Sequence, residues 1–167
     1  MDITIRRIRP EEYTALGELT CRAYIDGGLL DFGEEDPYAD VLRDVASRDA
    51  QAEVYVAVDE ADTLLGGVAF VPDGGPFADI AVPGEAEFRM LAVDEKARGR
   101  GTGEALVRTC AERARATPGC VRLVLSTQPT MYAAHRVYGR LGFVRTPERD
   151  WSPIPAVPLL TYALELY

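Results

Sequence analysis

A short run of arginines and glycines between two predicted secondary-structure elements constrains this sequence more than any other feature. The run is Arg98-Gly-Arg-Gly-Thr-Gly103. An apolar stretch typical of a strand, residues 87–93, precedes it, and helical spacing of apolar residues begins near Thr102. The run therefore wraps a helix N-terminus, where unpaired backbone N–H groups and the helix dipole attract anions. Its glycines permit positive φ and close approach of the backbone, and its arginines add charge-assisted bonds, so we predict a pyrophosphate-binding loop.

Two common nucleotide-binding motifs do not fit this loop. A nucleoside-triphosphate loop ends in Gly-Lys-Ser/Thr, whereas the one lysine of the chain, Lys96, precedes the glycines. A dinucleotide fingerprint reads Gly-x-Gly-x-x-Gly, whereas this run has glycines at alternate positions, residues 99, 101 and 103. The phosphate ligand therefore belongs to another class.

The overall charge excludes polyanionic partners. Eighteen lysines and arginines against 27 aspartates and glutamates give a formal net charge of −9. A chain this acidic repels phosphate backbones and anionic lipid surfaces at long range. We therefore expect no nucleic-acid partner and no membrane partner. An arginine-glycine loop that binds RNA is the weakest alternative, because it contradicts this charge.

Cysteine usage and the N-terminus bear on the compartment. Cys21, Cys110 and Cys120 are odd in number and irregularly spaced, which fits neither a disulfide framework nor a metal site. The N-terminal residues lack the apolar stretch of a signal peptide, and no apolar run approaches the roughly 20 residues of a membrane span. We expect a soluble cytoplasmic protein without a metal.

The chain reads as one mixed α/β domain over residues 1–167, since 167 residues are too few for two comfortable domains. Apolar periodicity and turn residues predict about seven strands and about four helices. A helix that links two strands favours their parallel pairing. The predicted strands are 3–8, 53–58, 64–71, 87–93, 121–125, one beginning at 143–144, and 159–166; the predicted helices are about 10–26, 37–48, 102–117 and 131–141.

The loop and a second motif together resemble one family. Residues 93–103 closely resemble the acetyl-CoA loop of the GNAT N-acetyltransferases, Arg/Gln-x-x-Gly-x-Gly/Ala, and residues 87–93 resemble the strand before it. Ala134-His-Arg-Val-Tyr138-Gly-Arg-Leu-Gly142-Phe143 resembles the second signature of the family, a helix that ends in tyrosine before Gly-Phe. The resemblance implies the GNAT fold and acetyl-CoA as the acyl-donor cosubstrate.

The resemblance also assigns the cofactor-binding residues. It implies that two central strands separate to admit the pantetheine arm, with strand backbone holding that arm and polarising the thioester carbonyl. One departure is Met131, which stands where family members often have a cofactor-binding asparagine, so Ser126 or Thr127 is expected to substitute. The expected cofactor-binding residues are Leu91, Ala92, Val93, Arg98, Gly99, Arg100, Gly101, Thr102, Gly103 and Thr127.

Two residues are candidates for the proton transfers of acetyl transfer. Tyr138 is the candidate general acid, since a phenol can protonate a thiolate of similar basicity; an ordinary core tyrosine is the alternative. Glu87 is the candidate general base, which would take the proton of the amine directly or through a water. The alternatives are that Glu87 forms a surface ion pair and that the amine loses its proton in bulk water. We interpret His135, the one histidine, as a surface residue, and we expect no cysteine nucleophile.

The acceptor is expected to be a primary amine of a small molecule or peptide, attacked directly in a ternary complex. Residues 26–36 carry five carboxylates that could attract a cation, although a solvated acidic loop is the favoured interpretation. Trp151 could line the acceptor pocket, and core packing or a homodimer contact are the alternatives. The alternative function is an acyl-CoA-binding regulatory module that turns over no acceptor.

Overall fold

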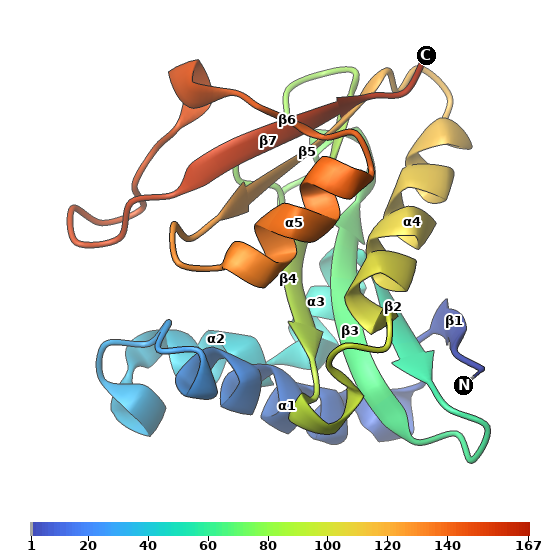
Figure 1. Ribbon diagram of the computed structural model, residues 1–167, viewed down its shortest axis with the longest axis vertical. Helices are drawn as coiled ribbons and strands as arrows, with labels where there is room; N and C mark the ends of the chain where they lie inside the picture. The colour runs from blue at the N-terminus through green and yellow to red at the C-terminus, as the bar shows by residue number, and fades with distance from the viewer. Residues whose placement is uncertain (1) are drawn as a thin grey trace.

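A seven-stranded mixed sheet carries five helices, as the computed structural model shows for residues 2–167 (Figure 1). The strand order across the sheet is β1-β2-β3-β4-β5-β7-β6. The strands are β1 (Thr4–Arg7), β2 (Glu53–Val58), β3 (Leu64–Val71), β4 (Glu85–Val93), β5 (Arg122–Thr127), β6 (Val144–Arg145) and β7 (Leu160–Glu165). The helices are α1 (Tyr13–Asp26), α2 (Pro37–Arg43), α3 (Val45–Gln51), α4 (Thr102–Arg115) and α5 (Tyr132–Arg140). These elements confirm the predicted mixed α/β fold.

Only one of the expected parallel pairs is present in this sheet. β4 and β5, which α4 connects, pair in parallel, and the other described pairs are antiparallel. The expectation was wrong for β1 and β2, because three helices separate them and return the chain to the end of the sheet at which β1 ended. It was also wrong for β5 and β6, because β7 lies between them.

The segment predicted as one helix over residues 37–48 is two short helices. Asp44 has non-helical backbone angles (φ −84°, ψ 66°), and its side chain accepts a hydrogen bond of 3.2 Å from the backbone N–H of Ser47. This aspartate therefore ends α2 and caps α3. The break explains why the structure has five helices where four were expected. Within residues 2–167, none of the helices combines the length and apolar character that a membrane crossing requires.

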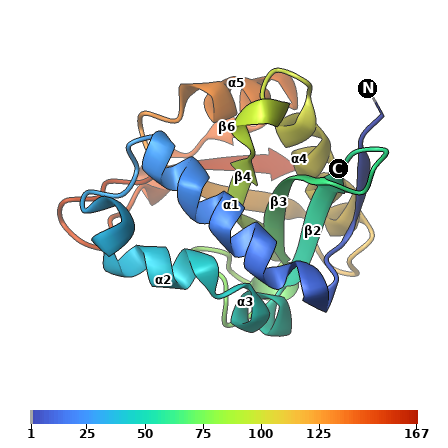
Figure 2. The ribbon, with the colours of Figure 1, turned by 90° about the horizontal axis from the view of Figure 1, so that it is seen from below.

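The helices cover both faces of the sheet, and successive side chains of β2 pack alternately against one face and the other. Tyr55 and Ala57 pack into the core beneath α4 and α5, whereas Val54, Val56 and Val58 pack against α1 and α3. Figure 2 shows α1, α2 and α3 together on their side of the sheet. Successive strand residues point to opposite faces, so a strand that is buried on both faces is apolar throughout.

The irregular strand β4 positions the functional site. It pairs with β5 only over residues 85–87, so its remaining residues have lost that neighbour. On its other side, Gly67 lies opposite Ala92 and Ala69 opposite Arg89, which leaves two β4 residues facing one residue of β3. Met90 within this bulge has φ +58°, which is rare for a non-glycine residue. The bulge bends β4 away from β5 and opens the sheet at its centre.

We predict that Gly66→Ala destabilises the protein. A Cβ atom at Gly66 would lie 2.5 Å from the carbonyl oxygen of Ala92, so the backbone of β3 or β4 has to shift. The expected cost is roughly 1–3 kcal/mol of the free energy of unfolding, measured by urea denaturation.

Gly139→Ala in α5 is the control for that substitution. A Cβ atom there meets nothing within 4 Å, and alanine favours a helix interior, so stability should stay constant or rise by up to about 1 kcal/mol. Equal stability of Gly66→Ala and the wild type would contradict the close approach of β3 to β4.

Candidate active site

The glycine loop lies at the N-terminus of α4, where it was predicted. Gly99 and Gly101 have φ +77° and +80°, and Gly101 is the N-cap residue of α4. A Cβ atom at either glycine would meet nothing within 4 Å, so the outer surface of the loop is open. Thr102 is buried and its hydroxyl donates to the carbonyl of Ala97, so this hydroxyl is engaged within the protein, while the backbone N–H of Thr102 is one of the first amides of α4, which lack intrahelical acceptors. The loop has the open surface and exposed Arg98 that a pyrophosphate group requires.

The end of β4 leads from this loop into the sheet. Leu91, Ala92 and Val93 lie beyond the last β4–β5 pair, and Ala92 is paired to Gly67 of β3 on the other side. Leu91 lines the pocket described below. The predicted strand residues thus border the gap between β4 and β5.

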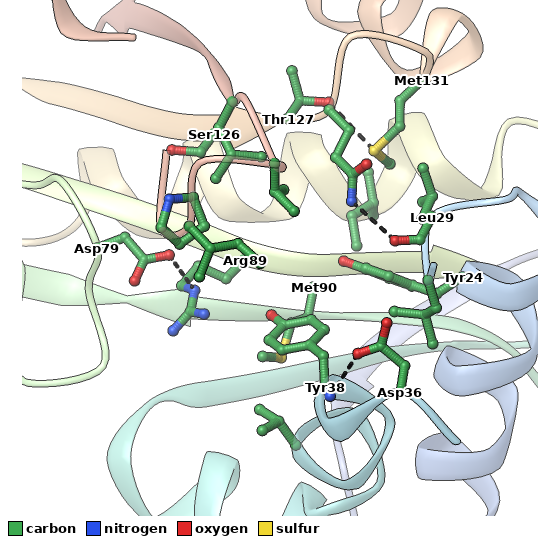
Figure 3. A pocket seen from close by; sticks show the side chains of 18 of the residues that line it. Tyr24, Leu29, Asp36, Tyr38, Asp79, Arg89, Met90, Ser126, Thr127 and Met131 are labelled. Carbon is green, nitrogen blue, oxygen red and sulfur yellow. Dashed lines mark hydrogen bonds and ion pairs between the residues drawn. The ribbon is translucent and has the colours of Figure 1, made fainter. Parts of the chain in front are cut away.

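A pocket of about 630 Å³ extends from this gap to the loop between α1 and α2 (Figure 3). Its volume lies in the range of small-molecule sites, about 300–1,000 Å³. Its walls come from residues 87–91 of β4, residues 126–131 at the end of β5, α2 with the loop before it, and residues 151–159. Tyr138 and Trp151 both line this pocket.

Tyr138 projects from α5 into an aromatic cluster at the pocket. Its ring centroid lies 5.5 Å from that of Tyr162, 5.8 Å from that of Phe143 and 5.9 Å from that of Phe88. Burial raises the pKa of the Tyr138 phenol, and the nearby Tyr24 phenol raises it further. The phenol is therefore protonated at neutral pH and placed where it could donate a proton into the pocket.

Tyr24 is a pocket residue that sequence reasoning missed. It lies on the last turn of α1, its side chain points into the pocket in Figure 3, and burial raises the pKa of its phenol. Its ring centroid is 6.4 Å from that of Tyr38. In the sequence Tyr24 has the helical spacing of the apolar residues of α1. This spacing does not distinguish a tyrosine in a pocket from a tyrosine in the core.

Glu87 is buried and bound to backbone. Its Oε1 accepts hydrogen bonds from the backbone N–H groups of Ile80 and Ala81, each at 2.9 Å, and from that of Asp79 at 3.1 Å. Burial raises the pKa of this carboxyl, whereas the backbone hydrogen bonds act in the opposite direction. Glu87 therefore fixes the loop before β4 against the strand, a role that the sequence did not indicate, and it also lines the pocket.

The ion pair of Asp79 and Arg89 forms a charged part of the pocket wall, which sequence reasoning also missed. Arg89 Nε lies 3.1 Å from Asp79 Oδ2, and Arg89 Nη1 donates to the carbonyl of Phe77 at 2.8 Å. The guanidinium also lies 4.5 Å from the ring centroid of Phe77. Asp79 stands in an irregular segment, so its meeting with Arg89 depends on the anchoring by Glu87 and has no local sequence pattern.

Thr127 links the end of β5 to α5. Its buried hydroxyl lies 3.5 Å from the Met131 sulfur and 3.3 Å from His135 Nε2. His135 is half-buried rather than on the surface, its Nε2 also lies 3.1 Å from the Gln128 carbonyl oxygen, and burial lowers its pKa. Thr127 and Met131 both line the pocket.

The remaining residues that the sequence singled out divide between the pocket and the core. Trp151 lines the pocket, and its Nε1 donates to the Ser126 hydroxyl at 2.9 Å. Asp31 and Asp36 of the acidic segment also line it. Cys21, Cys110 and Cys120 are buried, and desolvation raises the pKa of Cys110, so this thiol stays protonated.

A glycine loop at a helix N-terminus, an opened central sheet and a phenol in the adjoining pocket together fit an acyl-CoA-dependent transferase. The profile of the acetyltransferase (GNAT) family matches residues 13–143. The chain belongs to the GNAT acetyltransferase family.

One sequence relative is an uncharacterized N-acetyltransferase of Schizosaccharomyces pombe. It is 36% identical over 104 residues, which are 62% of this chain and 59% of that protein. The match therefore spans less than two thirds of the length of the relative.

Three solved structures share the fold. A GNAT acetyltransferase of Staphylococcus aureus superposes with a TM-score of 0.73 at 13% identity, covering 99% of this chain and 100% of that one. A putative acetyltransferase of Salmonella typhimurium, solved with its cofactor acetyl-CoA, has a TM-score of 0.69 at 20% identity, covering 100% and 95%. A ribosomal-protein-alanine N-acetyltransferase of Brucella melitensis has a TM-score of 0.72 at 19% identity, covering 98% and 99%. At these identities the structures show the GNAT fold alone.

We predict that Glu87→Gln loosens the loop before β4. A neutral amide accepts hydrogen bonds less strongly than a carboxylate, and its NH₂ group cannot accept them. Amide hydrogen exchange at residues 79–81, measured at pH 7, should therefore accelerate. Unchanged protection of these three amides would contradict the anchoring role.

The same variant should change the pH dependence of stability. The pKa of Glu87 is raised in the folded protein, so its proton stabilises the fold fully below the unfolded value of about 4.5, and this contribution is lost as pH rises through the folded pKa. Denaturation from pH 4 to 8 should show this decline in the wild type and a flatter profile in Glu87→Gln.

Proposed function

We propose that this protein transfers an acetyl group from acetyl-CoA to a primary amine by direct attack in a ternary complex. The observation that carries the proposal is the gap between β4 and β5, which borders the pocket that Tyr138 lines and lies along the strand that leads to the glycine loop. Donor and acceptor can thus meet inside the sheet. The S. pombe relative, described as an N-acetyltransferase, supports the nitrogen acceptor.

Acetyl-CoA fits the donor end. The pyrophosphate would lie on the loop of residues 98–103, where Gly99 and Gly101 leave the backbone N–H groups accessible. The pantetheine arm would run along Leu91, Ala92 and Val93, whose backbone faces no β5 partner. These unpaired backbone groups supply hydrogen bonds to the amide groups of the arm and a donor for the thioester oxygen.

The chemistry requires one bond to form and one to break. The amine nitrogen attacks the thioester carbon, the C–N bond forms, the C–S bond breaks, and CoA leaves as a thiolate. Tyr138 would then give its phenolic proton to the sulfur. Burial raises the pKa of this phenol, so the proton is present at neutral pH, although a buried phenol gives it up less readily than an exposed one.

The amine must also lose a proton. Glu87 stays the predicted base, and its raised pKa favours that role. Its Oε1 is already shared by three backbone N–H groups, so Oε2, which faces one longer bond of 3.2 Å, is the oxygen that could receive the proton through a water. Deprotonation by bulk water is the alternative. Loss of the acidic limb of the pH–rate profile in Glu87→Gln would favour the base role.

We predict that Gly101→Asp abolishes acetyl-CoA binding. The new carboxylate would project from the open surface of the loop into the pyrophosphate position, and the like charges repel. Isothermal titration calorimetry should show a loss of affinity of at least about tenfold.

Gly119→Asp is the matched control for the loop variant. Gly119 has φ +79° and an equally open Cβ position, but it lies beyond the other end of α4. The backbone strain is therefore comparable and the affinity should be unchanged.

Failure of the wild-type protein to bind acetyl-CoA, or to release CoA with any amine of a broad panel, would refute the proposed function.

We predict that Tyr138→Phe slows turnover without weakening the donor complex. Removal of a general acid costs typically about 10²–10⁴-fold in rate, whereas the Kd for acetyl-CoA should change by less than about twofold. Tyr132→Phe on the exposed side of α5 is the control, since Tyr132 is 65% exposed. Equal kcat in Tyr138→Phe and the wild type would remove the acid role.

A further inference from the structure

We propose that the acceptor is a primary amine with an apolar body, aryl or alkyl, and without a carboxylate. The inference rests on the proposed function and names the substrate class of the same pocket. Three features of the pocket support it: apolar walls, an excess of carboxylates, and a contact between the end of β5 and the loop before α2.

The pocket walls are predominantly apolar, and three exposed apolar side chains stand at the mouth. Phe32, Val41 and Ile154 are 71%, 45% and 56% exposed, and all three line the pocket. We call these three residues the apolar rim. Exposed large apolar residues that converge on one opening mark a binding surface for an apolar ligand. An amine that reaches toward the β4–β5 gap would leave its body against this rim.

The charges of the pocket disfavour an acceptor with a carboxylate. Among the described lining residues, Asp31, Asp36, Asp79 and Glu87 are acidic and Arg89 is the one basic residue. Arg89 is already engaged by Asp79, by the Phe77 carbonyl and by the Phe77 ring. A carboxylate in the acceptor would therefore meet excess negative charge, whereas a single ammonium group is attracted.

The same carboxylates do not form a polyamine site. Asp36 accepts from the backbone N–H of Tyr38 at 2.9 Å and caps α2, and Glu87 binds the loop before β4. Asp79 is paired with Arg89. Asp31, which is exposed at the mouth, is the remaining lining carboxylate. The several ammonium groups of a polyamine would thus share one carboxylate, that of Asp31, and would otherwise face apolar walls, which costs desolvation energy.

A hydrogen bond across the pocket favours a small molecule over a peptide. Gln128 Nε2 donates to the carbonyl oxygen of Leu29 at 3.4 Å, which joins the end of β5 to the loop before α2 (Figure 3). This contact bridges two walls that an extended peptide would have to pass between. The acceptor that fits is therefore compact.

Four acceptors, compared with phenethylamine as the reference, test this inference. Phenethylamine and phenylalanine share a ring and an amine and differ by a carboxylate; spermidine supplies extra charge without a ring, and a short peptide supplies an N-terminal amine on a longer chain. CoA release should give a kcat/KM for phenethylamine at least tenfold above each of the other three. Calorimetry on the CoA-loaded protein should show the same order of affinity.

Variants of the rim locate the apolar body. Ile154→Ser should raise the KM for phenethylamine at least threefold and leave the KM for ethylamine, which does not reach the rim, unchanged. Val144→Ser is the control, because Val144 is 67% exposed and does not line the pocket. Equal KM values for phenethylamine in Ile154→Ser and the wild type would overturn the assignment of the rim.

The outcomes separate the inference from the proposed function. Faster turnover of phenylalanine, spermidine or the peptide than of phenethylamine would overturn the inference while supporting amine acetylation. Absence of acetyl-CoA binding, or of CoA release with every amine, would refute the proposed function and the inference with it.

Discussion

The second half of β4 is hydrogen-bonded to β3 on one side and has lost β5 on the other, and the site depends on this interruption. β4 pairs with β5 over three residues, then the bulge at Met90 bends it away. Unpaired backbone in a protein interior is costly unless a ligand or solvent satisfies it. The arrangement persists because Gly66 lets β3 approach the bulged strand closely and because apolar side chains fill both faces of the sheet.

Anchoring of the segment before β4 completes the pocket. Glu87 binds three of its backbone N–H groups, Glu85 accepts from Val82, and Arg149 donates to the Ile80 carbonyl while pairing with Glu85. Two buried carboxylates of one strand thus hold a loop that has no regular structure of its own. In consequence Asp79 meets Arg89 at the pocket wall.

Local sequence patterns predicted the strands and the glycine loop. Periodicity located the seven strands and the glycine loop, since alternation and helix N-termini have short-range signals. The division of α2 from α3 was missed because a single capping aspartate, Asp44, outweighs the helical spacing around it. Tyr24 was missed because its spacing matches that of the apolar residues of α1, and Asp79 and Arg89 were missed because their meeting depends on the path of the whole chain. Tyr138 and Glu87 were named from the resemblance, and the burial and bonding of Glu87 could not be read from its position in a strand.

The two ends of the active site are built from different kinds of structure. The proposed donor end consists of a strand, a helix N-terminus and the glycine loop between them, whereas much of the pocket proposed for the acceptor consists of residues 29–32 and the proline-rich residues 151–159. Loops tolerate substitution and insertion better than the elements they join. If the proposed function holds, a lineage of such proteins can therefore diverge in its acceptors by changing these two segments, while the glycine loop and the strand before it are inherited intact.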